Sequence, residues 1–148
     1  IRCWQSQSQN PLPTKTKYYY GAELCGRLGK NGKQREPVVD GDTIDVLCDL
    51  GYDVRIALRL RLMGINTPES RTRNKAEKIL GLEAKEFLKD TLASADLIEF
   101  ESHDRGKYGR VLATIYTTTG EKRVNINELL VKKGHARYYD GGKREPWT

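Results

Sequence analysis

The sequence predicts a single α+β domain, because two hydrophobic periods follow one another along the chain. From Val54 to Met63, apolar residues alternate with others, as in a strand that buries one face. From Leu82 to Ala95, apolar residues recur at intervals of three and four, which is typical of an amphipathic helix. The length of 148 residues suits one domain with a core of its own. We expect this domain to span 17–148, preceded by a mobile N-terminal arm at 1–16 that is rich in Gln, Ser, Pro and Lys.

Five segments are expected to be strands, because they are rich in apolar and β-branched residues and end near turn-forming residues. They are Tyr18–Leu24, Thr43–Cys48, Val54–Met63, Leu97–Ser102 and Arg110–Tyr116. The longer helix therefore falls between the third and fourth strands. Thr117–Gly120 is expected to be a turn. Ile126–Lys133 is expected to be a short helix, with Asn125 or Asn127 as its cap and Gly134 at its end.

The alternation in the third strand also places charged residues. Ile56, Leu58, Leu60 and Leu62 would point into the core, and Arg59 and Arg61 would lie together on the opposite face. Arginines on such a face are ordinarily solvated, and we expect this of Arg59.

Composition narrows the class of protein. With 37% hydrophobic and 31% charged residues, the chain reads as soluble and globular, and a formal net charge of +6 favours a polyanionic partner. No apolar run approaches the roughly 18 residues of a membrane span, so we expect no membrane partner. No signal peptide is visible in this chain either, which leaves its compartment undetermined.

The cysteines and histidines argue against several kinds of site. Cys3, Cys25 and Cys48 are odd in number and lack CxxC spacing, which disfavours a zinc knuckle or a disulfide framework. We expect free thiols, with Cys48 in a strand core, although one Cys3–Cys25 bridge is an alternative. His103 and His135 are far apart in sequence, which disfavours a histidine metal site or a Ser-His-Asp triad.

Three short motifs carry the chemistry that the sequence offers. They are Asp40-Gly41-Asp42-Thr43, Asn66-Thr67-Pro68-Glu69 and Tyr108-Gly109-Arg110. Asp-Gly alone is a common turn. Together, and with Arg61 preceding the second motif, they supply oxygen ligands for a hard cation, a carboxylate base and arginines for phosphate.

This pattern resembles the staphylococcal nuclease (thermonuclease) family from about Val38 to Tyr139. The resemblance implies a five-stranded OB-fold Greek-key β-barrel with two or three helices. It also implies a Ca²⁺-dependent nuclease that hydrolyses DNA and RNA, prefers single strands and leaves 3′-phosphates. The chain departs from the family at Asn66, where the family has an acidic residue.

The resemblance implies a calcium site made of oxygen atoms. Asp42 would be a direct ligand, together with the side-chain oxygen of Asn66 and the backbone carbonyl of Thr67, and Asp40 would act through water. Pro68 restricts Thr67 to extended conformations, which would hold that carbonyl in place. An Asn oxygen still coordinates Ca²⁺, but the loss of one negative charge predicts weaker metal binding.

The resemblance also assigns the reaction and the substrate contacts. Glu69 would be the general base that deprotonates a water, and Arg61 and Arg110 would stabilise the charge that develops on the phosphate. Contacts with the substrate are expected from Lys107 and Tyr108, and from two tyrosines whose register with the family is offset, Tyr138 and Tyr139.

Two other readings of the motifs remain open. One is a catalytically silent OB-fold module that binds nucleic acid, and the other is a protein-interaction domain that only retains the motif. The presence of Glu69, Arg61 and Arg110 favours the enzyme, which we expect to be a monomer. A basic loop at Gly26–Glu36, which looks like an insertion relative to the family, is expected to be mobile and to add affinity for nucleic acid rather than chemistry.

Overall fold

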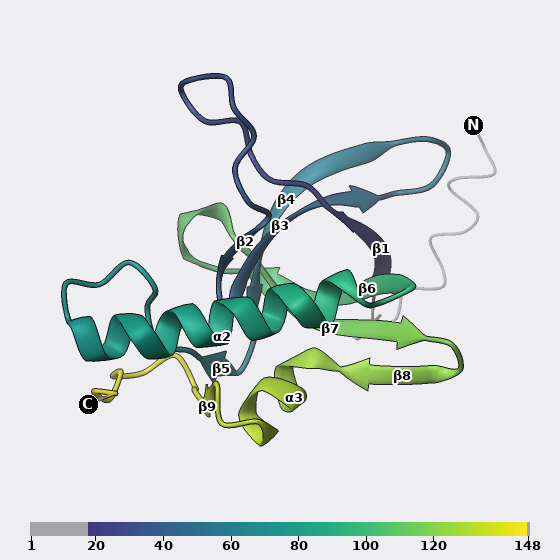
Figure 1. Cartoon of the computed structure of the whole chain (residues 1–148). Helices are drawn as coiled ribbons and strands as arrows, with labels where there is room; N and C mark the ends of the chain where they lie inside the picture. The colour runs from purple at the N-terminus through teal and green to yellow at the C-terminus, as the bar shows by residue number, and fades with distance from the viewer. Residues whose placement is uncertain (1–17, 148) are drawn as a thin grey trace, which may run out of the picture.

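Five strands form a closed barrel in the computed structural model, which describes residues 18–147 (Figure 1). They are β1 (Tyr18–Leu24), β3 (Thr43–Asp49), β4 (Arg55–Leu62), β6 (Leu97–Arg105) and β7 (Val111–Thr119). Neighbouring strands pair antiparallel, except that β4 and β7 pair in parallel, and β1 closes the barrel by pairing with both β3 and β6. This order confirms the predicted OB-type Greek-key barrel with α+β composition.

Four short strands lie outside the five-stranded barrel. β2 (Val38–Asp40) pairs with β3, β8 (Lys122–Asn125) pairs with β7, and β5 (Ile65–Asn66) pairs with β9 (Arg137–Tyr138). The predicted turn at Thr117–Gly120 is wrong in its first three residues, since β7 continues through Thr119. A run of β-branched threonines favours the strand, and the chain reverses at Gly120 and Glu121.

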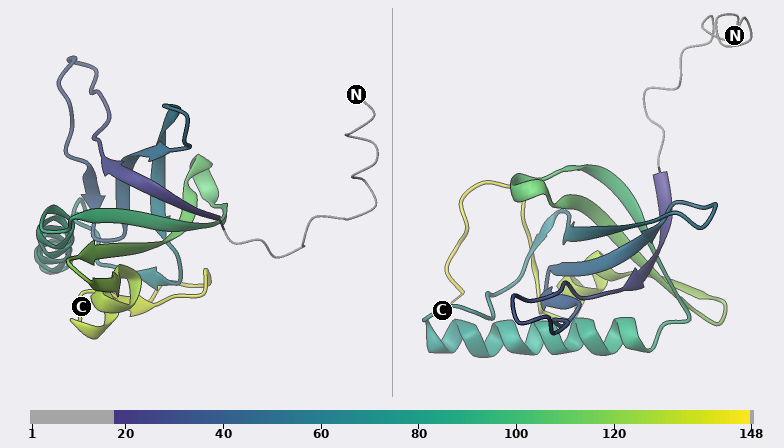
Figure 2. Two further views of the ribbon diagram at one scale, coloured as in Figure 1. Left: turned by 90° about the vertical axis from the view of Figure 1, so that its right-hand side faces the viewer. Right: turned by 90° about the horizontal axis from the view of Figure 1, so that it is seen from above.

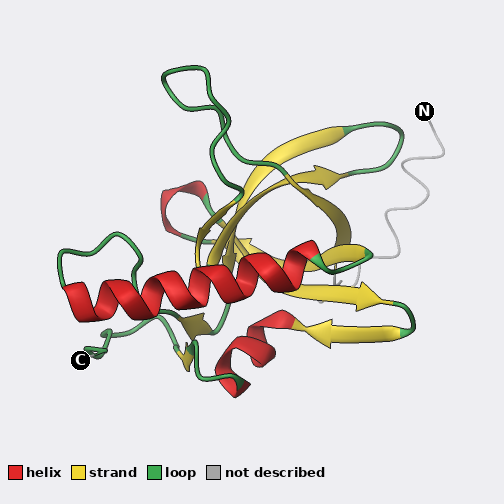
Figure 3. Cartoon of the chain, viewed as in Figure 1, coloured by secondary structure: helices red, strands yellow, loops and turns green. Residues whose placement is uncertain are grey.

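Within residues 18–147, two α-helices and one 3₁₀ turn accompany the strands. α2 (Lys75–Ala93) passes in front of the lower part of the barrel, and α3 (Ile126–Lys132) lies below it (Figure 3). η2 (Lys107–Gly109) lies between β6 and β7. α2 begins seven residues before the predicted Leu82, because the Asn74 side chain accepts hydrogen bonds from the backbone N–H groups of Ala76 and Glu77.

The two candidate caps of α3 have different roles. Asn125 is the cap, since its side chain accepts from the Glu128 backbone N–H at 3.2 Å. Asn127 is buried and connects elements. Its Oδ1 accepts from the Ile115 N–H, and its Nδ2 donates to the carbonyls of Met63 and Ala113.

The core lies inside the barrel and under both α-helices. It includes strand residues and residues of α2 and α3, among them Ile44, Leu60, Leu62, Phe100, Ile115, Leu88, Leu92, Ile126 and Leu130. Cys48 is buried as predicted, and Cys25 and Cys48 are both free thiols. Cys3 and the arm predicted at 1–16 lie outside the described residues. In the part of the chain that the structure describes, no helix is long and apolar enough to cross a membrane.

The alternation predicted for β4 is correct only in part. Leu60 and Leu62 are fully buried, but Ile56 lies 43% exposed near the opposite end of the strand. Arg61 is only 6% exposed, so it is buried rather than solvated, although it lies outside the hydrophobic core. Arg59 is half-buried as well, because it forms a two-point ion pair with the buried carboxylate of Asp45.

The basic loop Gly26–Glu36 forms a hairpin that projects from the barrel (Figures 1 and 2). Backbone hydrogen bonds join Gly29 to Lys33 and Arg27 to Arg35, each at 2.8 Å. Gly26 is needed at the base of the hairpin, because a Cβ there would lie 1.6 Å from the Arg35 carbonyl oxygen. Its mobility and its contribution to affinity stay predictions.

A close approach between α2 and the segment at Glu69 yields the first testable prediction. A Cβ at Gly81 would lie 2.5 Å from the Glu69 carbonyl and 2.6 Å from the Ser70 nitrogen. Alanine usually stabilises an exposed helix interior by about 1 kcal/mol relative to glycine. Here Gly81→Ala should instead lower the free energy of unfolding by about 1–3 kcal/mol, because backbone atoms must move to admit the methyl group. Urea denaturation measures this change.

Lys78→Ala is the matched control, since Lys78 is an exposed residue one turn earlier on the same helix. Its free energy of unfolding should stay within about 0.5 kcal/mol of the parent. A Gly81→Ala protein as stable as the parent would show that this approach is not a packing constraint.

Candidate active site

Most of the predicted site residues lie where the turn between β2 and β3, the end of β4 and the residues after β5 meet the C-terminal segment. Two adjoining hollows mark this place. A groove of about 520 Å³ is lined by Arg61, Lys107, Arg110, Tyr139 and Arg144, among others. The second hollow is lined by Asn66, Thr67, Glu69 and Arg144, together with part of the chain near Trp147. Arg144 thus lies on the boundary between them.

Asp42 is a buried carboxylate held by three partners. It accepts from the Thr43 hydroxyl at 3.0 Å and from the Thr67 backbone N–H at 3.2 Å. Its Oδ2 also lies 3.3 Å from Nη2 of Arg61, and both side chains are at most 10% exposed. A charge removed from water needs such partners, and these connect β3, β4 and the segment after β5.

Arg61 belongs to a cluster of positive charge. Its Nη1 donates to the Leu62 carbonyl at 2.8 Å. Burial lowers the pKa of Arg61, the Asp42 carboxylate raises it, and the nearby guanidinium groups of Arg110 and Arg144 lower it further. Positive charge gathered in this way favours an anion in the groove, whether a phosphate or the carboxylate of an acidic side chain.

Asn66 and Thr67 carry buried oxygens that lack partners. Asn66 Oδ1 and Thr67 Oγ1 make no hydrogen bond with any described residue. A buried polar atom without a partner is costly, which favours a water or a cation beside it. The Asn66 amide oxygen and the nearby Asp42 carboxylate are the kinds of ligand that a hard cation takes. Among residues 18–147, no group of three or more Asp, Glu, His or Cys side chains is placed to hold a metal, so neutral oxygens must provide much of such a site.

Asp40 has a structural contact in the site. It accepts from the backbone N–H of Ser70 at 3.1 Å and from the Ser70 hydroxyl. Ser70 is itself buried, so this contact fastens the residues after Glu69 to β2.

Glu69 is the predicted base, and its partner was not predicted. The carboxylate is half-exposed, and its Oε1 lies 3.0 Å from Nη1 of Arg144. The Glu69 backbone N–H also donates to the Glu77 side chain of α2, at 3.3 Å. The sequence signal for Arg144 is modest: it follows Gly141-Gly142-Lys143, a short basic segment just beyond the two tyrosines.

Lys107, Tyr108 and Arg110 lie around the η2 turn. Arg110 Nε donates to the Lys107 carbonyl at 3.2 Å, and the Arg110 guanidinium lies 5.7 Å from the centre of the Tyr108 ring. Tyr108 has a φ of 62° and is 94% exposed, so its ring points into solvent beside the groove. Lys107 and Arg110 themselves line the groove.

The two C-terminal tyrosines occupy different places. Tyr139 lines the arginine groove, and its hydroxyl donates to the Gly142 carbonyl at 2.6 Å. Tyr138 is 75% exposed and lines another hollow with Asn66 and Arg137. The arrangement therefore brings Tyr139 toward Arg61 and Arg110, and it does not bring Tyr138 there.

A buried Asp–Arg pair, a half-exposed glutamate and further arginines thus lie around two adjoining hollows on an OB-type barrel. Comparison with known proteins identifies the family. The family model described as staphylococcal nuclease homologue matches residues 59–146. An uncharacterized protein of Methanocaldococcus jannaschii is 34% identical over 92% of this chain and 67% of its own length.

Two further relatives have names that refer to nucleases. An uncharacterized endonuclease of Escherichia coli is 30% identical over 84% of this chain and 67% of its own length. The thermonuclease of Staphylococcus intermedius is 37% identical over 68% of this chain and 55% of its own length. The chain belongs to the staphylococcal nuclease family.

The unpartnered oxygen of Asn66 yields a testable prediction about calcium, the cation that the family resemblance implies. Asn66→Asp adds a negative charge beside the buried Asp42 carboxylate. The charge count of oxygen ligands tunes Ca²⁺ affinity, so the variant should bind Ca²⁺ more tightly. Without Ca²⁺ it should melt at a lower temperature than the parent, because the two carboxylates repel each other, and added Ca²⁺ should raise its melting temperature more.

Calorimetric titration and thermal melts with and without Ca²⁺ measure both effects. Asn31→Asp makes the same chemical change in the exposed basic loop, and it should leave Ca²⁺ affinity unaltered. Equal affinities for Asn66→Asp and the parent would mean that Asn66 does not contact the cation.

Proposed function

We propose that this chain is a Ca²⁺-dependent nuclease that hydrolyses phosphodiester bonds of DNA and RNA, prefers single strands and leaves 3′-phosphates. The observation that carries the proposal is the groove in which Arg61, Arg110 and Arg144 gather beside the Glu69 carboxylate. Membership of a nuclease family supports it. We also propose that the enzyme is a monomer.

In the proposed reaction, Glu69 takes a proton from a water molecule whose oxygen attacks the phosphorus. The bond from phosphorus to the 5′ oxygen breaks, and that oxygen takes a proton from solvent. Arg61 and Arg110 donate hydrogen bonds to the phosphate oxygens, on which negative charge increases in the transition state. Their rigid, planar guanidinium groups match the geometry of phosphate.

The oxygen atoms around Asp42 are suitable ligands for the Ca²⁺ ion that the proposed activity would require. The Asp42 carboxylate, the Asn66 amide oxygen and the Thr67 carbonyl would hold Ca²⁺, with Asp40 acting through water. Calcium, when bound, supplies positive charge for the phosphate. Asp42 is the one buried carboxylate among these ligands, and its ion pair with Arg61 offsets part of its negative charge. This supports weak rather than tight metal binding.

Substrate contacts extend from the groove toward solvent. Lys107 would contact a neighbouring phosphate, and Tyr139 lies close enough to Arg61 to line the same path. The exposed rings of Tyr108 and Tyr138 offer faces on which unpaired bases can stack, without preference for sequence. This supports single-stranded substrates.

A second candidate function has one observation in its favour. Glu69 is paired with Arg144, and Asn66 carries no charge, so the site has fewer free carboxylates than hydrolysis would use. A catalytically silent OB-fold module that binds nucleic acid would fit this charge pattern.

A metal titration tests the proposed activity. Cleavage of denatured DNA should require Ca²⁺ and stop in excess EGTA, because the candidate ligands are oxygens without a His or Cys cluster. Restoring Ca²⁺ should restore cleavage, which serves as the control for damage by the chelator. Undiminished cleavage in EGTA would rule out the calcium assignment.

Substitutions test the assigned roles. Glu69→Gln should lower turnover by about 10²–10⁴-fold, and Arg110→Ala by about 10²–10³-fold, since each removes a group that acts in the transition state. Arg61→Ala should lower turnover too, but it also breaks a buried ion pair and should destabilise the fold by about 3–5 kcal/mol. Initial rates on a labelled oligonucleotide, with a thermal melt of each variant, separate the two effects.

Two matched controls are available away from the groove. Arg55→Ala changes an exposed arginine at the other end of β4, and Glu121→Gln changes an exposed residue in the turn between β7 and β8. Both should keep parental rates. If Glu69→Gln and Arg110→Ala kept them as well, the silent binding module would be the better account.

A further inference from the structure

We propose that Arg144 is a positioning residue for the reaction, carried into the site by a C-terminal strap at 139–147. The inference rests on the proposed nuclease function and adds a residue to it. Arg144 would hold the Glu69 carboxylate in the orientation from which it takes a proton from water.

The contact joins two residues 75 positions apart in sequence. Among residues 18–147, Arg144 is the one ion-pair partner of the Glu69 carboxylate. The two side chains are 47% and 54% exposed, so the pair adds little to folding stability. Its effect is therefore on orientation, since a half-exposed glutamate without a partner samples several rotamers.

The strap is fastened at both ends. At its beginning, the Tyr139 N–H donates to the Gly64 carbonyl at 2.8 Å, and the Tyr139 hydroxyl donates to the Gly142 carbonyl at 2.6 Å. At its far end, Arg137 of β9 donates to the Pro146 carbonyl at 3.1 Å, and its guanidinium lies 4.0 Å from the centre of the Trp147 ring.

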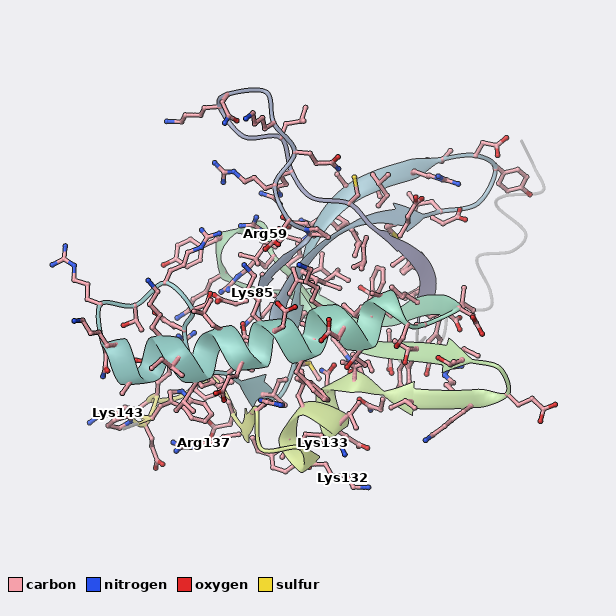
Figure 4. All side chains as sticks on the ribbon, in the orientation of Figure 1. Arg59, Lys85, Lys132, Lys133, Arg137 and Lys143 are labelled. Atoms are coloured by element: carbon pink, nitrogen blue, oxygen red, sulfur yellow. The ribbon has the colours of Figure 1, made fainter. Side chains whose placement is uncertain are left out.

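The course of the strap explains where Arg144 lies. In the right-hand view of Figure 2, the yellow segment passes the η2 turn and returns toward the beginning of α2. Figure 4 labels Arg137 and Lys143 in this part of the molecule, beneath α2. Between the two fastenings, the Arg144 guanidinium lies 5.9 Å from the centre of the Tyr139 ring, and the Gly142 N–H donates to the Asp140 side chain at 2.9 Å. Because the stacking of Arg137 on Trp147 fastens the far end of the same segment, it also helps to determine the position of Arg144.

The location of Arg144 fits a role in aiming the base. It lines the groove that contains Arg61 and Arg110, and it also lines the hollow that contains Asn66 and Glu69. A base must face the water that attacks a phosphate bound by the arginines. A displacement of about 1 Å in such an arrangement can cost about 100-fold in rate. The alternative is that Arg144 binds a substrate phosphate directly, and the two roles have different kinetics.

Steady-state kinetics on a single-stranded oligonucleotide with saturating Ca²⁺ tests the proposal. Arg144→Ala should lower kcat by about 10–100-fold and leave KM within about twofold, because the group acts through Glu69. Arg144→Lys should recover part of the loss, since it keeps the charge but not the planar fork. Lys143→Ala, one residue earlier in the strap, is the control and should keep the parental kcat.

Combined variants test the mechanism more directly. Trp147→Ala should give a smaller loss of kcat than Arg144→Ala, and the Arg144→Ala/Trp147→Ala protein should be no slower than Arg144→Ala alone. In a Glu69→Gln background, Arg144→Ala should cause little further loss. If the two substitutions lowered kcat by factors that multiply, Arg144 would act independently of Glu69, and the proposal would be wrong.

The outcomes separate this inference from the proposed function. A raised KM with unchanged kcat would identify Arg144 as a phosphate contact and overturn the positioning role. If Arg144→Ala kept the parental kcat while Glu69→Gln lost it, the inference would fail and the nuclease assignment would stand. Parental activity in Glu69→Gln would remove both.

Discussion

The buried ion pair between Asp42 and Arg61 is the interaction on which the rest of the site depends. Asp42 lies in the turn between β2 and β3, and Arg61 lies near the end of β4, where it pairs with Thr43 of β3. The ion pair therefore adds a side-chain contact to the pairing of these two strands. The same carboxylate accepts the Thr67 backbone N–H, which places the residues around Asn66 and Glu69. Both charged side chains are nearly removed from water, so removing one of them would leave an unpaired buried charge and lower the stability of the fold.

This pair also determines the electrostatic character of the groove. Asp42 offsets one guanidinium group, whereas Arg110 and Arg144 add positive charge close enough to lower the pKa of Arg61. Glu69 offsets Arg144 in the same way, through an ion pair at 3.0 Å. The positive charge that is left over belongs to Arg110 and Lys107 at the mouth of the groove, where a phosphate of the substrate would enter.

Much of the fold and part of the site follow from the sequence, and the exceptions have physical reasons. The barrel strands were predicted because each strand carries its own pattern of apolar residues within a few positions of the sequence. The first turns of α2 were not predicted, since Ile79 and Leu80 are exposed and give no amphipathic pattern. The burial of Arg61 could not be predicted from alternation, because its ion-pair partner Asp42 lies outside β4. The contact of Arg144 with Glu69 is equally non-local, and no spacing rule connects a strap residue to a loop residue.

Asn66 shows why membership of a family does not by itself decide the chemistry. The fold holds Asn66 and Thr67 in a buried place where their side-chain oxygens have no hydrogen-bond partner among the described residues, which leaves room for a water or a cation beside them. The net negative charge of that site, however, is small. Asp42 already shares its charge with Arg61, and an amide stands where the family has an acid, so neutral oxygens must provide most of the attraction for a cation. A phosphate held by the arginines would add the negative charge that the protein lacks there. Binding of metal and of substrate should therefore favour each other more strongly in this chain than in relatives that keep the acidic residue.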